Sequence, residues 1–267
     1  MRKYTAIFRM RYLNVIQYRA AALGGAATQF AWGSMEILAF LAFYRANPSN
    51  FPMEFSEVSS YIWLQQAFLA LFMMWFWEAD IVKNITDGGV AYEMVRPVDL
   101  YNRWFFTITA NRLARATLRC IPILLVGFIL PSPIGLSLPP SLPQFGLFLV
   151  STALALSVVA AFAMLVYISM FYTLSAMGTR MVAAILSDFL AGAIIPLPFF
   201  PENIRRVVEF LPFASMQNMP LRIYSGNVSG SDAIRGIALQ LFWLITLVFI
   251  GKISIKRALR KVIVQGG

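Results

Sequence analysis

Long apolar stretches, each close to the length of a membrane-crossing helix, alternate along the chain with short polar segments. A helix needs roughly 20 residues to cross the hydrocarbon core of a bilayer. Apolar residues follow one another in these stretches, without the strict alternation of a half-buried strand. The pattern predicts an all-α, polytopic membrane protein with six transmembrane helices. The predicted helices cover Ala20–Tyr44, Val58–Trp77, Leu113–Leu130, Gln144–Tyr172, Met177–Ile195 and Ile237–Ile253.

The first 19 residues precede the first predicted span and mix apolar with basic side chains. Tyr4, Phe8 and Tyr12 recur at helical spacing, with Arg9 and Arg11 among them. This spacing is typical of an interfacial amphipathic helix lying on the cytoplasmic leaflet. The alternative is a disordered basic tail.

Residues 196–235, between the fifth and sixth predicted spans, are too many for a plain connector. They are also apolar for a water-exposed loop, with Val207, Val208, Phe210 and Leu211 in one short run. We expect an outer, re-entrant-like helical hairpin. The alternative is a surface cap that never enters lipid. On either interpretation, residues 1–267 form one transmembrane domain.

Charge is sparse and one-sided. The chain has 22 Lys and Arg against 12 Asp and Glu, and 17 of the 22 basic residues fall in segments that the spans place on one side. Cytoplasmic loops are rich in Lys and Arg, so both termini are predicted to be cytoplasmic, in a bacterial inner membrane. A net charge of +10 would suggest nucleic acid in a soluble protein. Here anionic membrane lipid is the expected partner, and no nucleic acid is expected.

Residues that commonly carry catalysis or bind metals are scarce. The chain has no His and a single cysteine, Cys120, and it contains no GxxxxGK[ST] phosphate loop, HExxH or GxSxG motif. The commonest metal ligand and general base are therefore missing. We expect no catalytic site, no bound metal and no resident cofactor. Any ATP would be bound by a partner subunit.

Two acidic residues lie midway along predicted spans, Glu36 in the first and Asp188 in the fifth. A charge in the hydrocarbon costs about 3 kcal/mol or more on insertion scales, so such residues face a partner or a wet cavity. They are candidates for the substrate path, with structural pairing as the alternative. Arg112, Arg115 and Arg119 share one helix face, and either snorkel to lipid phosphates or line a basic inner vestibule.

The segment after the second span, residues 81–103, has an unusual order of features. A short amphipathic helix leads to Gly88-Gly89, then to a turn-length apolar segment and to Arg96-Pro97. This order resembles the coupling segment of bacterial ABC-2-type permeases, in which a Gly-containing element ending in an apolar pair and Arg-Pro follows the second span. Met94 and Val95 stand where leucines are common, and they keep the apolar character.

The resemblance extends to the six spans, the basic N-terminal helix and the outer hairpin, and therefore covers essentially the whole chain. It implies a permease subunit of an ATP-driven exporter, working with an ABC ATPase subunit and a second permease in a homo- or heterodimer. The translocation path would run along the interface between the two permeases. Residues that would contact the ATPase are Ile81, Ile85, Tyr92, Met94, Val95 and Arg96.

The first candidate substrate is a hydrophobic or cationic drug-like compound, with a lipid-linked glycan or a peptide as alternatives. Two other classes of function remain open. A membrane-embedded lipid-modifying enzyme would need a polar catalytic cluster, and a non-transporting lipid-binding scaffold would leave the coupling-like segment unexplained.

Overall fold

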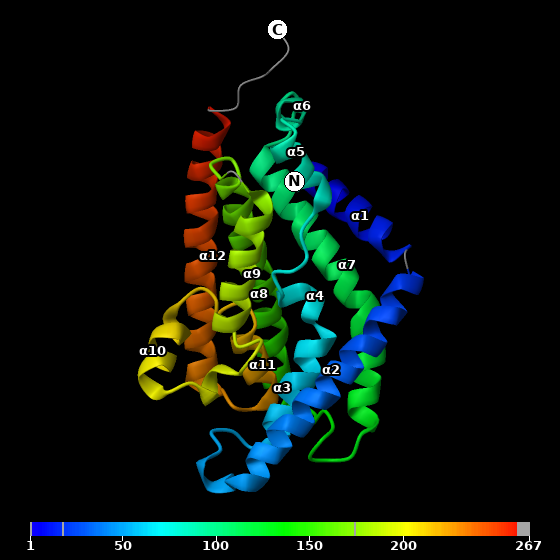
Figure 1. Ribbon diagram of the computed structural model, residues 1–267, viewed down its shortest axis with the longest axis vertical. Helices are drawn as coiled ribbons and strands as arrows, with labels where there is room; N and C mark the ends of the chain where they lie inside the picture. Colours follow the sequence, from blue (N-terminus) through cyan, green and yellow to red (C-terminus); the bar gives the residue numbers. More distant parts are fainter. Residues whose placement is uncertain (1, 18, 174, 261–267) are drawn as a thin grey trace.

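The computed structural model describes residues 2–17, 19–173 and 175–260, and this part of the chain is all-helical (Figure 1). Lys261, which the charge count assigned to the cytoplasmic tail, lies outside the described residues. The α-helices are α1 Arg2–Ile16, α2 Arg19–Ala46, α3 Phe55–Ala67, α4 Leu69–Phe72, α5 Ala79–Thr86, α6 Val90–Met94, α7 Leu100–Ile129, α8 Leu142–Ser169, α9 Ala176–Leu190, α10 Glu202–Phe210, α11 Asn218–Ser225 and α12 Gly230–Leu259. Two 3₁₀ turns, η1 Pro48–Asn50 and η2 Leu197–Phe199, complete the order.

Three helices in the described part of the chain are long and apolar enough to cross a membrane: Gly24–Ala46, Leu142–Ser169 and Gly230–Leu259. They correspond to the first, fourth and sixth predicted spans. The third prediction began too late, because α7 is one continuous helix from Leu100 and includes the arginines that precede the apolar stretch. The fifth ended too late, because α9 stops at Leu190 before a turn with Gly192 at φ +79°.

The second predicted span is not a continuous helix. Phe68, at φ −103° and ψ 16°, separates α3 from the single turn of α4. The chain then leaves the helix at Met73, which is extended at ψ 138°. Residues 73–78, which we call the linker, therefore join α4 to α5 as a non-helical stretch. The predicted helix over 58–77 was wrong in its last five residues.

Helix α8 lies at the centre of the bundle and packs along α12 (Figure 1). Small buried residues on α8, among them Ala155, Ala160 and Ala163, let neighbouring helices approach closely. The Ser151 hydroxyl donates to Gln240 Oε1 at 2.9 Å, and the Gln240 amide donates back to the Ser151 carbonyl at 3.2 Å. These buried hydrogen bonds hold α8 and α12 in register.

The end of the molecule that carries η1 is closed by α11. This short helix packs against α3 and α8. Its carbonyl at Ile223 accepts a hydrogen bond of 2.7 Å from the buried Gln144 side chain of α8. Helix α10 packs less closely, and Ile204, Val207 and Phe210 on it are more than half exposed. Helices thus do form within the segment predicted as a hairpin.

The opposite end carries α1, α5, α6 and the last turns of α12 (Figure 1). Helix α1 packs along α7, with Tyr4 stacked on Phe106 at 5.5 Å. Arg11 on α1 forms an ion pair of 2.8 Å with Asp80 at the start of α5. The N-terminal residues therefore form a helix, as predicted, and that helix braces the segment that follows the linker.

Candidate functional site

A cavity of about 680 Å³ opens between α2, α3 and α9. Polar side chains from four separate segments reach it, although the surrounding helix faces are apolar. The lining residues are Gly25, Thr28, Gln29, Trp32, Glu36, Gln65, Gln66, Leu69, Met73, Trp75, Arg119, Ile185, Asp188, Ala193 and Ile194. The two candidate substrate-path residues, Glu36 and Asp188, thus lie on one cavity.

Glu36 reaches the cavity from α2 and is bound by amides of α3. Its Oε2 accepts hydrogen bonds from the side chains of Gln65 at 3.3 Å and Gln66 at 3.4 Å. Gln65 also donates to the Ala193 carbonyl at 3.0 Å and accepts from Gln217 at 3.1 Å. Because both glutamines are buried, their amides are held in place and fix the position of the Glu36 carboxylate.

Asp188 reaches the same cavity from α9, where it is 5% exposed. Its Oδ1 accepts a hydrogen bond of 3.2 Å from the backbone N–H of Met74, in the middle of the linker. The Trp75 side chain lies beside the carboxylate. Asp188 therefore lines the cavity and also contacts the linker that leads to α5.

Arg112 holds the other side of the linker. It is fully buried on α7 and donates to the carbonyls of Leu71 at 3.2 Å, Met73 at 2.8 Å and Phe76 at 3.3 Å. These carbonyls have no helical partner because α4 ends at Phe72. Both sequence interpretations of Arg112 were wrong, since it neither snorkels to lipid nor lines an open vestibule. It stabilises an interrupted helix.

Glu78, at the end of the linker, is buried among groups from α7 and α8. Its carboxylate pairs with Arg115 at 3.2 Å and accepts a hydrogen bond of 2.6 Å from Asn111. Its backbone N–H donates to the Tyr167 hydroxyl at 2.7 Å. The structure thus uses this buried acid to fix the start of α5.

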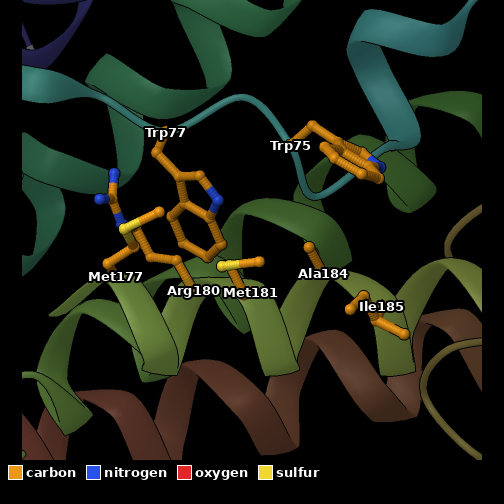
Figure 2. A pocket seen from close by; sticks show the side chains of 7 residues that line it. All are labelled: Trp75, Trp77, Met177, Arg180, Met181, Ala184 and Ile185. Carbon is orange, nitrogen blue, oxygen red and sulfur yellow. The ribbon is translucent and has the colours of Figure 1, made fainter. Parts of the chain in front are cut away.

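A smaller pocket of about 190 Å³ separates the linker from α9. Figure 2 shows Trp77 descending from the linker toward Met181, while Trp75 lies farther along, above Ala184 and Ile185. Trp75 and Ile185 line both this pocket and the larger cavity. Hydrogen bonds thus hold the backbone of the linker firmly. Its side chains pack less tightly against α9, because the pocket lies between them.

The predicted coupling segment consists of two short helices, α5 and α6, separated at Gly88, where φ is +75°. Five of its six predicted contact residues, all apolar or aromatic, divide into two sets. Ile81 is buried and Ile85 packs against the inner core. Tyr92 and Val95 are each 81% exposed, and Met94 is half exposed. We call Tyr92, Met94 and Val95 the apolar tip.

The apolar tip is held by ion pairs. Glu93, between its members, is 9% exposed and pairs with Arg103 of α7 and, at 3.9 Å, with the exposed Arg96. The Lys3 ammonium group of α1 donates to the Pro97 carbonyl at 3.2 Å. The backbone that carries the exposed apolar side chains is thus held in place by contacts with α1 and α7.

Sequence reasoning missed the amides that line the cavity, Gln29, Gln65 and Gln66. A signal for them was present. Gln29 and Glu36 are seven residues apart and therefore share a face of α2. Adjacent glutamines in the middle of an apolar stretch are costly in lipid unless they find partners. Arg119 joins them at the Gly25 end of the cavity, which agrees for this arginine with the vestibule interpretation of the sequence.

Comparisons with known proteins bear on what the cavity and the coupling segment do. No curated protein matches the sequence of this chain. The sequence profile of one family, described as ABC-2 family transporter protein, matches residues 30–266. The match covers most of the chain and includes both carboxylates of the cavity and the whole coupling segment. The chain therefore belongs to the ABC-2 family of transporter proteins.

Proposed function

We propose that this chain is the permease subunit of an ATP-driven exporter in a bacterial inner membrane. Its family makes it a membrane permease of an ABC transporter, a class that works with an ABC ATPase subunit. The proposal adds export, six membrane passages with both termini in the cytoplasm, an outer re-entrant-like hairpin and a second permease as partner. ATP is bound by the ATPase subunit, and the permease itself carries out no chemical reaction.

The observation that carries the proposal is the exposed apolar tip. Tyr92 and Val95 would be costly to leave in water, and they lie at the end of the molecule that also carries α1 and the end of α12. A small apolar protrusion on a rigid support fits a groove on a partner and can transmit force from it. Ile81 and Ile85 serve the same purpose from inside, because they anchor α5 to the core.

The second permease is supported by the two helices that flank the cavity. Trp32, Met35 and Leu38 on α2 are all about 60% exposed. Met181, Val182 and Ile185 on α9 are more than half exposed. A partner permease placed against α2 and α9 would cover these side chains and close the cavity into a path between the two subunits.

Helices α3, α7 and α9 are too short, or too rich in charge, to be identified as membrane spans from length and composition alone. Their arrangement in the bundle supports six passages. The guanidinium of Arg112 is buried and hydrogen-bonded to carbonyls, and Arg115 pairs with Glu78, so α7 keeps much of its charge away from lipid. Helices α3 and α9 lie beside spanning helices and share the cavity with them. Exposed Ile204, Val207 and Phe210 on α10 suit a hairpin set into the outer leaflet.

The test is co-expression of the tagged permease with its partner ABC ATPase subunit. Val95→Asp and Arg96→Glu should leave the permease in the membrane and reduce both ATPase co-purification and permease-dependent ATP hydrolysis at least several-fold. Arg235→Glu is the matched control, because Arg96 and Arg235 are both exposed and each pairs with an acid three residues earlier. Unchanged hydrolysis in both tip variants would remove the basis of the proposal.

A further inference from the structure

Three buried hydrogen-bond acceptors around the cavity lack a partner within the described chain. They are Gln29 Oε1, Glu36 Oε1 and Asp188 Oδ2. Gln29 and Asp188 are 6% and 5% exposed, so bulk water does not simply cover them. Buried polar side chains are satisfied in the large majority of cases. All three atoms are oxygens on one cavity, and together they call for a ligand that donates hydrogen bonds.

The charge near these atoms also selects the ligand. Glu36 and Asp188 each have one oxygen engaged by the protein, in the first case by glutamine amides and in the second by the Met74 N–H. Their other oxygens are buried without a hydrogen-bond partner in the described part of the chain. Hydrogen bonds between a cation and a carboxylate are about twice as strong as neutral ones, so a cationic donor gains most here.

Aromatic walls add a second requirement. Trp32 and Trp75 line the cavity, and each presents more than half of its surface. Indole faces attract cations and also cover apolar surface. A ligand that places an apolar body against these rings and a cationic N–H group against the carboxylates would match both the acidic oxygens and the aromatic walls of the cavity.

Arg119, which would repel a cation, lies at the other end of the cavity. Its guanidinium packs against Gly25, where an added Cβ would come within 3.0 Å of it, and lies 5.7 Å from the centre of the Phe76 ring. Gly25 and Glu36 are eleven residues apart on α2, which is about 16 Å along a helix. The acidic end of the cavity is thus separated from this guanidinium.

We propose that the cavity binds an amphipathic cation that carries N–H donors, a protonated primary or secondary amine, with its nitrogen at Glu36 and Asp188 and its apolar body against Trp32 and Trp75. This rests on the proposed function, since it names the substrate class of that permease. A cation without N–H donors meets the charge but leaves the free carboxylate oxygens unpaired, and binds more weakly.

The amine can come from two sources with the same chemistry, a free amphipathic amine or the ammonium headgroup of phosphatidylethanolamine. The full-length permease is therefore reconstituted, without ATPase, in nanodiscs of phosphatidylcholine alone and in nanodiscs that also contain phosphatidylethanolamine. Binding is followed by fluorescence anisotropy of two cationic dyes of similar size. Rhodamine 6G carries two N–H donors, whereas tetramethylrhodamine ethyl ester carries none.

In phosphatidylcholine the permease should bind rhodamine 6G about tenfold or more tightly than the tetramethyl dye. Glu36→Gln and Asp188→Asn should each weaken rhodamine 6G binding about tenfold, because the amide keeps the acceptor that the protein uses and loses the charge. Asp232→Asn, at an exposed acid on α12, is the control and should change nothing. Weaker dye binding in the presence of phosphatidylethanolamine would identify the lipid headgroup as the source, and unchanged binding would identify a free amine.

Equal binding of the two dyes, or rhodamine 6G binding that survives Glu36→Gln, would overturn the proposal and leave a non-selective apolar cavity. If Asp188→Asn loosens the linker and fails to fold, Glu36→Gln decides alone, because Glu36 does not contact the linker. The assay contains no ATPase. Its failure would therefore leave the coupling proposal intact, and failure of coupling would leave the dye result intact.

Discussion

Replacing Arg112 with methionine should destabilise the permease more than replacing any exposed arginine. Methionine fills similar volume but leaves the carbonyls of Leu71, Met73 and Phe76 without their donor. An unsatisfied buried group costs about 1–3 kcal/mol, so three cost about 3–9 kcal/mol. Removing a fully desolvated charge offsets part of this. We expect a net loss of about 3 kcal/mol, which corresponds to a fall of about 6–12 °C in unfolding temperature.

Thermal unfolding can be followed in detergent with a thiol-reactive dye, because Cys120 is the single cysteine and is partly buried. Arg112→Lys keeps the charge but not the fork of donors, and should fall between wild type and Arg112→Met. Arg235→Met removes an exposed arginine and is the control. The reasoning is refuted if Arg112→Met unfolds within about 2 °C of that control, since surface ion pairs contribute only about 0–1 kcal/mol.

Two further predictions use the same protein. In a Cys120→Ala background, Asn47→Cys and Ser225→Cys should react with a membrane-impermeant reagent from outside, and Asp87→Cys only from inside; external labelling of position 87 would contradict the proposed orientation. Gly251→Val should lower the unfolding temperature by several degrees, because a Cβ there would lie 2.6 Å from the Tyr101 ring, and overpacking costs about 1–3 kcal/mol. Gly146→Ala, where nothing lies within 4 Å, should change nothing, and equal effects of the two substitutions would show that α7 and α12 do not meet as described.

The two short helices of the predicted coupling segment could be predicted from sequence because their signals are local. Gly88 adopts a positive φ, which other residues rarely do, so this glycine marks the break between α5 and α6 in the sequence. Asp99 caps α7 by accepting from the Asn102 N–H at 2.9 Å, which marks the next helix start. Short-range turn and cap chemistry of this kind can be read without knowing the fold.

The interruption of the second span could not be predicted in the same way. Residues 68–77 are uniformly apolar, and nothing in that run favours an end at Phe72. The extended linker exists because Arg112, Asp188 and Tyr167 supply hydrogen-bond partners, and all three lie far along the chain. The same holds for the cavity. Glu36 was identified as costly in lipid, but its meeting with Asp188 on one cavity depends on helix packing alone.

The central claim is that the apolar tip of α6 docks on the ATPase subunit. Its most direct test places the photo-crosslinker p-benzoylphenylalanine at Tyr92 in the co-expressed, membrane-embedded complex, and at Phe210, an exposed apolar residue at the other end of the molecule, as control. The account predicts a permease–ATPase product from position 92 and none from position 210. No product from position 92, in a complex that still hydrolyses ATP in a permease-dependent way, would contradict it.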